Sequence, residues 1–207
     1  MRAVFIFVVI LLLIAMAVPA TFAVRFWMDG QAVLARAERS GALRAPTERG
    51  PLTGVERTIA MSEFRSTWKT SGTPCRTAVF LWADLTTDDA PHGMPVSQRV
   101  STRLLGEQQG TSIRWQIRRL IVACQLEQRF DDTRLLRMWL ATVNFGQDAV
   151  GIEAASQSIF GKPSRDLNAE ESARLAVLLK GSSLRNQPER WGERARALQE
   201  RLAAPAH

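Results

Sequence analysis

Apolar residues recur at helical spacing over most of the chain from Pro95 onward. The clearest helix is predicted to begin at Asp131, a typical N-cap residue, and to end near Val143. Its apolar stripe consists of Leu135, Leu136, Trp139 and Leu140. A stripe of this width predicts that one face of the helix packs against a core while the other faces water.

Two more helices have legible ends. Asn168 is followed three positions later by Glu171, which is the capping-box pattern of a helix start, and Gly181 is placed to end that helix. The stretch AVGIEAASQSIFGK, from Ala149 to Lys162, predicts a short helix with small residues on its inner face and a glycine stop.

The chain before Asp131 predicts one central helix. One apolar face of it consists of Ile117, Leu120, Ile121 and Cys124. Val122 and Leu126 lie on the other side, so we expect this helix to be mostly buried. Strand signals are nearly absent from the sequence, which predicts a mainly α domain.

The sequence before Pro95 is less regular. Phe26–Ser40 predicts a helix, and Gly41–Glu56 has the Gly, Pro and Thr content of a linker. Arg57–Lys69 is again helical in pattern, whereas Thr73–Gly93 is irregular. We therefore expect an N-terminal helix and a linker, followed by a folded domain.

An uncharged apolar run covers Ala3–Val24, with Arg2 before it and Arg25 after it. At helical rise it is long enough to span about 30 Å of hydrocarbon. We therefore expect a transmembrane anchor at residues 1–25. A cleaved signal peptide is the alternative, because residues 20–23 offer small side chains near a cleavage site.

The domain organisation follows from these segments. Residues 26–56 are expected to form the juxtamembrane helix and linker, and residues 57–207 a single helical domain. The arginines that follow the apolar run, which include Arg36 and Arg39, outnumber those before it. By the positive-inside rule this excess favours a domain on the cytoplasmic side.

The chain carries a net charge of +7 with a pI near 10.8, almost entirely from arginine. Such a balance indicates an anionic partner: nucleic acid, an anionic membrane surface or a phosphate-bearing ligand. We exclude nucleic acid, because the chain has no recognisable DNA- or RNA-binding motif and carries a membrane segment.

Cysteine and histidine are scarce. Cys75 and Cys124 allow one disulfide if the domain lies outside the membrane, and an unpaired buried pair is the equal alternative. His92 and His207 are the only histidines, so we expect no histidine metal cluster.

The most specific motif signal is the stretch LEQRFDDTRLLRMWLATVNFGQDAVGIEAASQSIFGKPSRDLNAEESARLAVLLKG, which begins at Leu126. It resembles the peptidoglycan glycosyltransferases of family 51, in the class A penicillin-binding proteins and the monofunctional biosynthetic transglycosylases. The family's Gly-Ile-x-x-Ala-Ala-x-x-Tyr-Phe-Gly-Lys motif is matched by Gly151, Ile152, Ala154, Ala155, Phe160, Gly161 and Lys162. Upstream, IAMSEFRSTW (59–68) and GMPVSQRVSTRLL (93–105) resemble two further family segments.

The resemblance implies a lysozyme-like transglycosylase domain, mainly α, behind one N-terminal transmembrane helix. Its substrate would be lipid II, a lipid-linked disaccharide-pentapeptide whose lipid diphosphate leaves when an acceptor hydroxyl attacks. One carboxylate must take the proton of that hydroxyl. Positive charge or a divalent metal must stabilise the departing diphosphate.

The resemblance also implies a location and partners. The location is the bacterial inner (cytoplasmic) membrane, as a single-pass protein with the domain on the periplasmic side, which conflicts with the arginine excess after the anchor. The implied partners are lipid II or a glycan strand, membrane lipid and cell-wall synthases.

Glu63 falls at the family's catalytic base, so it is the candidate base. The candidate substrate-binding residues are Arg65, Ser97, Gln98, Arg99, Arg103, Arg118, Arg119 and Lys162. Guanidinium groups suit phosphate oxygens because they donate two parallel hydrogen bonds. The equal alternative for the arginines is a solvated basic face near anionic lipid headgroups, and for Lys162 neutralisation of its own helix end.

Several family positions hold a different residue in this chain. The Asp after the base is Phe64 and the downstream His is Thr70. Three motif positions are changed as well, the Lys to Asp132, the Glu to Arg137 and the Asn to Ala141. A divalent metal is implied by the resemblance, but its expected acidic position holds Arg119, and no cofactor is otherwise implied. We expect impaired or lost turnover, with non-catalytic binding of lipid II, glycan or a synthase as the alternative.

Overall fold

The structure is a computed structural model that describes residues 2–43, 50–64, 75–79, 94–106, 112–146 and 149–204, with the backbone alone at 2–16, 18 and 19. The α-helices of the described ranges are α1 (Arg2–Arg39), α2 (Gly54–Glu63), α4 (Val96–Leu105), α5 (Ile113–Arg129), α6 (Asp132–Leu140), α7 (Ile152–Phe160), α8 (Ala169–Leu178) and α9 (Pro188–Ala203). Two short 3₁₀ helices follow α7 and α8, namely η2 (Ser164–Asp166) and η3 (Ser182–Asn186). Within these ranges, the only β-type pairing is one isolated antiparallel bridge between Asn144 and Val150. The expected mainly α class is therefore confirmed.

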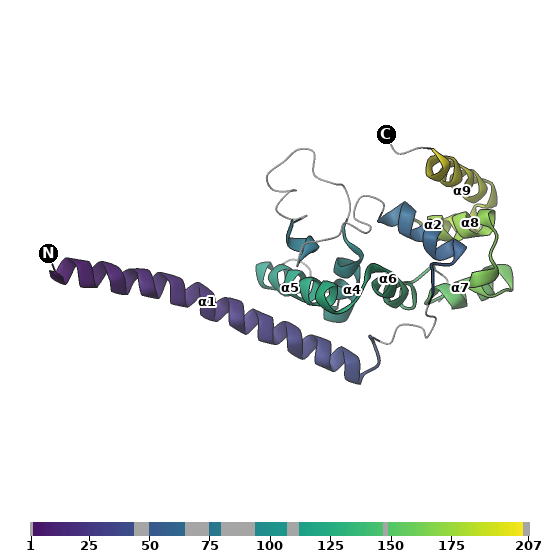
Figure 1. Ribbon diagram of the computed structural model, residues 1–207. Helices are drawn as coiled ribbons and strands as arrows, with labels where there is room; N and C mark the ends of the chain where they lie inside the picture. The colour runs from purple at the N-terminus through teal and green to yellow at the C-terminus, as the bar shows by residue number, and fades with distance from the viewer. Residues whose placement is uncertain are drawn as a thin grey trace.

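Helix α1 is long, and its C-terminal part lies along α5 and α4 (Figure 1). The side-chain amide of Gln125 donates a hydrogen bond of 2.9 Å to the carbonyl oxygen of Trp27. Gly30 allows this approach, because a Cβ there would lie 2.7 Å from Oε1 of Gln125. Leu34 and Ala37 are buried in the core. The predicted helix at residues 26–40 is thus the end of a longer helix that packs into the domain.

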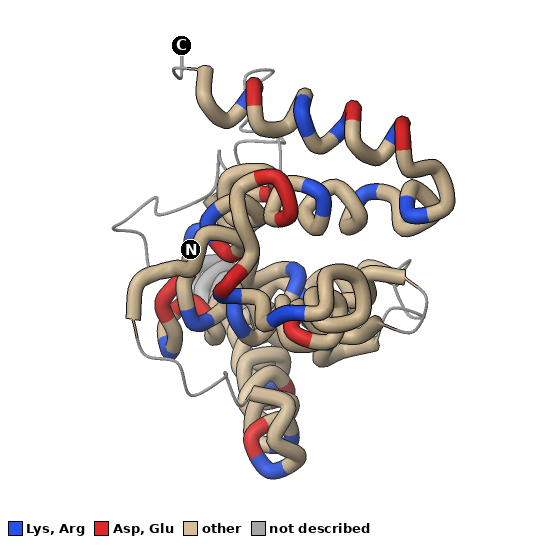
Figure 2. The backbone as a smooth tube through the Cα atoms, turned by 90° about the vertical axis from the view of Figure 1, so that its right-hand side faces the viewer, with Lys and Arg blue, Asp and Glu red and all other residues tan. Residues whose placement is uncertain are grey.

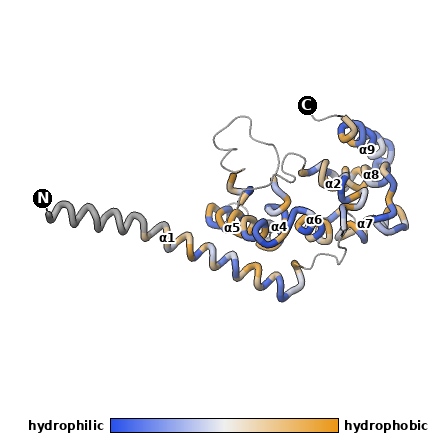
Figure 3. Tube along the Cα trace, viewed as in Figure 1, coloured by the Kyte–Doolittle hydropathy of each residue, from blue (hydrophilic) through white to orange (hydrophobic). Residues whose placement is uncertain are grey.

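The expected membrane anchor corresponds to the N-terminal part of α1. Within the described part of the chain, no helix is both long and apolar enough to cross a bilayer. The expected anchor falls mostly on residues 2–16, 18 and 19, whose side chains lie outside the description. Figure 3 shows hydrophobic and hydrophilic positions alternating along the C-terminal part of α1, as expected for a helix packed on one side. The domain boundaries at residues 25 and 56 stay predictions.

Helices α2, α8 and α9 pack together at the end of the molecule away from the N-terminus of α1 (Figure 1). Ile59 of α2 and Leu175 of α8 are fully buried in this part of the core. Helix α9 is fixed to α8 by Trp191, whose indole N–H donates a hydrogen bond of 2.7 Å to the carbonyl oxygen of Arg174. This packing places the C-terminal end of α2 beside α8 and α9.

The predicted caps of α6 and α8 are confirmed. Asp131 accepts a hydrogen bond of 2.8 Å from the backbone N–H of Arg134. Asn168 and Glu171 form a reciprocal capping box, with both hydrogen bonds at 2.9 Å. These helix starts could be predicted from sequence because the capping residue and its partner are only three residues apart.

The start of α2 was predicted wrongly. The helix begins at Gly54, inside the expected linker, because Thr53 and Glu56 form a second capping box. The side chain of Thr53 accepts from the N–H of Glu56, and the carboxylate of Glu56 accepts from the N–H of Thr53 at 2.8 Å. The helix ends at Glu63, and residues 65–69 of the predicted helix lie outside the described residues.

Helix α7 has the predicted glycine stop, since Gly161 takes a left-handed conformation with φ of 69°. Gly151 precedes the helix with φ of 90°, and a Cβ there would lie 2.8 Å from the carbonyl oxygen of Ala141. Ala155 and Ser156 are buried as expected, but Ala154 is exposed. The expectation that all the small residues face inward was therefore wrong for Ala154.

Helix α5 is central only in part. A run of its residues is buried, comprising Val122, Ala123, Cys124, Gln125 and Leu126. Ile117, which was expected on the buried face, is 36% exposed, and Ile113 is 80% exposed. The buried face of α5 is the one that packs against α1 and α4. Tertiary contacts, and not the spacing of apolar residues alone, therefore determine which face is buried.

Candidate functional site

Glu63 is the last residue of α2, and its side chain is 10% exposed. The ammonium group of Lys180, on the turn after α8, lies 3.3 Å from Oε1 of Glu63. That Oε1 is buried and has no hydrogen-bond partner among the described residues. The candidate base is therefore withdrawn from bulk water, and its buried oxygen forms an ion pair with Lys180 that lacks hydrogen-bond geometry.

Glu63 lines a cavity of about 310 Å³ between α2, α8 and α9, here called the Glu63 pocket. Three cations line the same cavity, namely Lys180, Arg194 and Arg201. Ala176 and Val177 of α8 supply part of an apolar wall. The three cations were not among the predicted site residues. The spacing of Arg194 and Arg201, two helical turns apart on α9, was the available signal that they share a face.

Ser97 lies at the start of α4 inside a buried hydrogen-bond network. Its hydroxyl donates to Oε1 of Glu127 at 2.6 Å, and the hydroxyl of Thr77 donates to the same oxygen at 2.7 Å. The backbone N–H of Arg76 donates to the other carboxylate oxygen at 2.7 Å. Ser97 is fully buried, so its hydroxyl is committed to Glu127 in this conformation.

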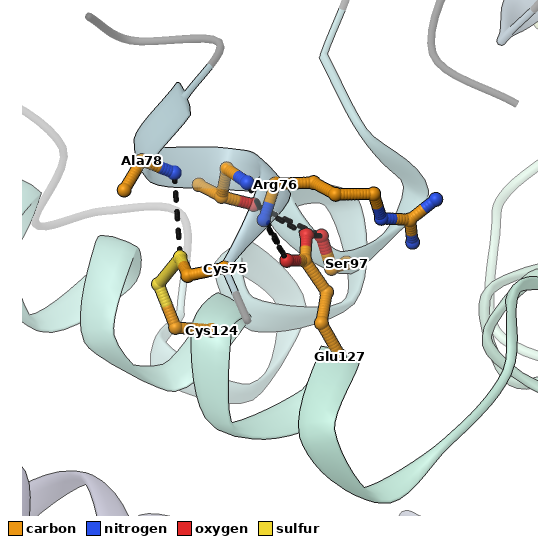
Figure 4. Close-up of a disulfide and its surroundings, with 7 residues drawn as sticks. Cys75, Arg76, Ala78, Ser97, Cys124 and Glu127 are labelled. Carbon is orange, nitrogen blue, oxygen red and sulfur yellow. Dashed lines mark hydrogen bonds between the residues drawn. A yellow bond between two sulfur atoms is a disulfide. The ribbon is translucent and has the colours of Figure 1, made fainter. Parts of the chain in front are cut away.

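A disulfide joins Cys75 to Cys124 of α5, with 4.8 Å between the two Cα atoms. Figure 4 shows it next to the network of Arg76, Ser97 and Glu127. The bond resolves the alternatives left open by the sequence in favour of pairing. It fixes the helical turn at residues 76–79 to α5 beside the start of α4.

The predicted arginines of α4 and α5 do not line the Glu63 pocket. Arg103 and Arg118 line a groove of about 450 Å³ between α1, α4, α5 and α6. Nε of Arg118 lies 2.7 Å from a carboxylate oxygen of Asp29 on α1, so this arginine is paired. Arg99 is exposed, and Gln98 is partly buried. Arg65 lies outside the described residues.

Arg119 was the position expected to carry an acidic metal ligand in the family. Its guanidinium carbon lies 5.2 Å from the ring centroid of Trp115, a cation–π contact. Burial lowers the pKa of the Arg119 guanidinium below its ordinary value. No group of three or more His, Cys, Asp or Glu side chains in the described ranges is arranged to hold a metal. Within the described residues, Arg119 and its neighbours therefore supply no acidic ligand set for a divalent cation.

Lys162 follows α7 and pairs with a residue of α8. Its Nζ lies 2.8 Å from Oε1 of Glu171. The hydrogen bond from Lys162, together with the backbone N–H of Asn168, holds the pKa of the Glu171 carboxyl below its ordinary value. Lys162 thus links α7 to the start of α8 in this conformation.

The residues at the changed motif positions form interior contacts. Nε of Arg137 lies 2.8 Å from Oε1 of Glu56, and the guanidinium also donates to the carbonyl oxygens of Gly50 and Pro51. Asp132 forms a bidentate pair with Arg76, whose pKa is raised mainly by that hydrogen bond.

Phe64 also occupies a changed motif position. It is 1% exposed and packs edge-on against Trp139, with 5.3 Å between ring centroids. Like Arg137 and Asp132, Phe64 therefore makes an interior contact, here between the end of α2 and α6.

The predicted site residues therefore fall into separate places: Glu63 in its own pocket, Ser97 in the interior, Arg103 and Arg118 at the second groove, and Lys162 against α8. Glu63, the candidate base, lies in a cavity beside three cations that the sequence did not single out.

The comparison with known families decides the affiliation. A family model described as Transglycosylase matches residues 55–203. The chain belongs to this family. The match covers α2 through α9, including the Glu63 pocket and the network around Glu127.

Relatives of this chain include penicillin-binding protein 1C of Escherichia coli, which is 36% identical over 141 residues, 68% of this chain and 18% of that protein. The biosynthetic peptidoglycan transglycosylase of Shewanella frigidimarina is 39% identical over 83 residues, 36% of this chain and 37% of that protein. Penicillin-binding protein 1A of Aquifex aeolicus is 30% identical over 113 residues, 53% of this chain and 15% of that protein. The chain thus matches well under half the length of each relative.

Proposed function

We propose that this chain is a membrane-anchored transglycosylase domain that acts on lipid II in peptidoglycan glycan synthesis, with impaired turnover. The observation that carries the proposal is Glu63, a nine-tenths-buried carboxylate at the family's base position that lines a cavity among cations. Buried carboxylates placed in cavities are suited to proton transfer because water does not compete for them.

In the proposed reaction Glu63 takes the proton of the acceptor sugar's hydroxyl as that oxygen attacks the anomeric carbon of the donor. The bond from that carbon to the lipid diphosphate breaks, and the diphosphate leaves with the electron pair. Cationic side chains stabilise the negative charge that develops on it. Lys180, whose ammonium lies 3.3 Å from Glu63, adds to the positive charge beside the reacting groups.

Impaired turnover is supported by what replaced the other motif residues. Arg137 and Asp132 are held in ion pairs of the interior, so neither presents a carboxylate or amide to a substrate. Arg119 contacts Trp115 instead of supplying an acid. Glu63 therefore works without these partners, and we expect slower chemistry than in relatives that retain them.

The proposed location is the periplasmic side of the bacterial inner membrane, with the apolar run Ala3–Val24 as a single-pass anchor. The disulfide between Cys75 and Cys124 supports this side, because such bonds persist in oxidising compartments. We give it more weight than the arginine excess after the run, which predicted the opposite orientation.

The test is polymerisation of lipid II by the full chain in detergent or vesicles, read as glycan product. We expect slow product formation that Glu63→Gln abolishes, while the control Glu200→Gln, which changes an exposed carboxylate of α9, leaves it intact. No product under conditions in which an ordinary family member works would remove the enzymatic proposal.

A second candidate function is non-catalytic binding of lipid II, a glycan strand or a cell-wall synthase. The interior pairs of Arg137 and Asp132 favour it, because the fold is maintained where motif chemistry has been lost. It predicts lipid II binding that survives Glu63→Gln and weakens in Arg118→Ala or Arg119→Ala. Unchanged binding in both arginine variants would remove the reason for it.

A further inference from the structure

Exposed hydrophobic side chains gather where α1 passes the start of α5, and the two helices lie side by side (Figure 1). Six of the nine large hydrophobic side chains that are exposed in the described part of the chain lie here, namely Phe22, Val24, Trp27, Met28, Ile113 and Ile117. Single exposed hydrophobic residues are ordinary on a protein surface, whereas a cluster of them indicates an interaction site.

A crevice of about 550 Å³ lies between the two helices within this cluster, here called the α1–α5 crevice. The α1 residues on its lining are spaced three or four apart, so they share one face of that helix. None of the lining residues belongs to the Glu63 pocket. The lining consists of Phe22, Arg25, Phe26 and Asp29 of α1 and of Ile113, Arg114 and Ile117 of α5.

The charge of the α1–α5 crevice is positive. A carboxylate oxygen of Asp29 lies 2.7 Å from Nε of Arg118, an ion pair that neutralises the one acidic residue of the lining. Arg25 and Arg114 are exposed, and neither forms an ion pair within the described residues. Two guanidinium groups are therefore available to the oxygens of an anion beside an apolar wall.

The α1–α5 crevice lies at the end of the apolar run Ala3–Val24. Arg25 is the first residue after the run, and Phe22 lies about 4.5 Å before it along the helix axis. If the run spans the hydrocarbon, Phe22 lies at the hydrocarbon edge and Arg25 among the headgroups. The lining thus changes from apolar to basic at the depth where a phospholipid changes from acyl chain to phosphate.

We propose that the α1–α5 crevice binds one anionic phospholipid of the bilayer. Its acyl chain packs against Phe22, Ile113 and Ile117, and its phosphate is held by Arg25 and Arg114. The inference deepens the proposed function, because the depth of the crevice rests on the proposed anchor. The bound lipid ties the start of α5 to the membrane surface, so that the domain is held at a second point besides the anchor.

An anionic lipid fits better than the other occupants of an apolar crevice. A zwitterionic lipid brings a cationic group beside the two unpaired guanidinium groups, whereas an anionic headgroup is attracted by them. A second copy of this chain would bring an identical basic face, and like charges across an interface are unfavourable.

The first test measures which lipids the full chain retains in native mass spectrometry. The chain is released from detergent micelles that contain equal amounts of phosphatidylglycerol and phosphatidylcholine with the same acyl chains. The parent should retain phosphatidylglycerol about tenfold more than phosphatidylcholine. Arg25→Gln and Arg114→Gln should each lower the retained phosphatidylglycerol about fivefold, since each removes one guanidinium from the headgroup. No preference in the parent would overturn the proposal.

Two arginine variants control for loss of charge alone. Arg39→Gln removes the same charge from an exposed position of α1 outside the crevice. Arg196→Gln does so on α9, along which basic and acidic residues alternate (Figure 2). Both should stay within about twofold of the parent. A loss in either control as large as that in Arg25→Gln would overturn the proposal, because overall charge would then explain the retention.

Ile113→Ser and Ile117→Ser test the apolar wall without a change of charge. Each should lower the retained phosphatidylglycerol about threefold, because contact with the acyl chain is lost. Both positions are exposed, so the fold should persist, which helical circular dichroism checks. The matched control is Val150→Ser, which changes an exposed apolar residue outside the crevice. Unchanged retention in both isoleucine variants would overturn the crevice in favour of attraction between charges alone.

A vesicle experiment separates this inference from the proposed function. A chain that alkaline carbonate strips from vesicles, but that keeps the lipid preference and its loss in the variants, rejects the anchor and leaves the crevice supported. A chain that stays in vesicles but shows no preference overturns the crevice alone. A dimer in detergent that Ile113→Ser dissociates assigns this face to a second copy and likewise overturns the proposal.

Discussion

At α6 the charged side chains of Arg137 and Asp132 pair with residues of other segments in the interior, whereas around the Glu63 pocket charged side chains line a cavity. Arg137 is 6% exposed and is bound to Glu56 from α2. Arg194 and Arg201 are exposed and line the cavity of the Glu63 pocket. Arginine thus forms a structural ion pair in the first region and lines a cavity in the second.

The two regions also differ in what has happened at the positions of the family motifs. Where a charged residue has been replaced by one of opposite sign, as at Arg137 and Asp132, its new partner is another protein side chain. At Glu63, the candidate base, the carboxylate instead pairs with the half-exposed Lys180 and lines a cavity. Substitutions in the first region should therefore change stability, and those in the second should change binding or turnover.

The largest effect on stability is expected from Arg137→Met. The variant leaves the carboxylate of Glu56 buried and unpaired, which should cost about 3 to 5 kcal/mol of unfolding free energy. Chemical denaturation of the full chain measures it. The double variant Arg137→Met with Glu56→Gln, which keeps the hydrogen bond of the capping box but removes the unpaired charge, should recover part of the loss, and no recovery would show that the unpaired charge is not the cause.

Removal of the disulfide should come next. Replacement of Cys75 and Cys124 by serine frees a loop of 49 residues, and the chain-entropy relation gives a loss of about 4 kcal/mol, with about 2 to 4 typical in practice. Denaturation under oxidising conditions measures the loss, and the double variant should equal the reduced parent. A double variant as stable as the oxidised parent contradicts the role of the bond.

A smaller, pH-dependent effect is expected from Glu171→Gln. The folded-state pKa of Glu171 is depressed by Lys162, so its contribution is present above the unfolded pKa and is lost as the pH falls through the folded pKa. Glutamine keeps the capping box, so the variant isolates the charge. Stability should fall by less than about 1 kcal/mol at neutral pH and match the parent in acid. A difference that persists in acid contradicts the assignment.

The smallest effect is expected from Arg194→Gln and Arg201→Gln on stability. Both side chains are exposed, so the unfolding free energy should change by no more than about 0.5 kcal/mol. Thermal unfolding followed by helical circular dichroism measures it. A loss as large as that of Arg137→Met would mean that α9 uses these arginines structurally, and the contrast between the two regions would fail.

Much of the helical framework could be predicted from sequence because its signals are local. The caps at Asp131 and Asn168 and the stop at Gly161 each involve residues within a few positions. The start of α2 carried a signal of the same kind in Thr53 and Glu56, which the apparent linker composition obscured. Family motifs added the position of Glu63, which no periodicity would have singled out.

The partners of the charged residues could not be predicted in this way. Arg137 and Glu56 are 81 positions apart, and Arg118 and Asp29 are 89 apart, so only the packed helices bring them together. The wall of cations beside Glu63 depends on the docking of α9 on α8 and α2. Sequence therefore singled out arginines of α4 and α5, whereas the cations that line the Glu63 pocket come from the turn after α8 and from α9.

The most direct measurement is the rate of lipid II consumption by the full chain and by Glu63→Gln at equal, saturating protein concentration. If Glu63 is the working base, the parent consumes lipid II slowly and the variant at least about a hundredfold more slowly still. Equal rates in the two proteins would contradict the account, because the buried carboxylate would then take no part in the chemistry.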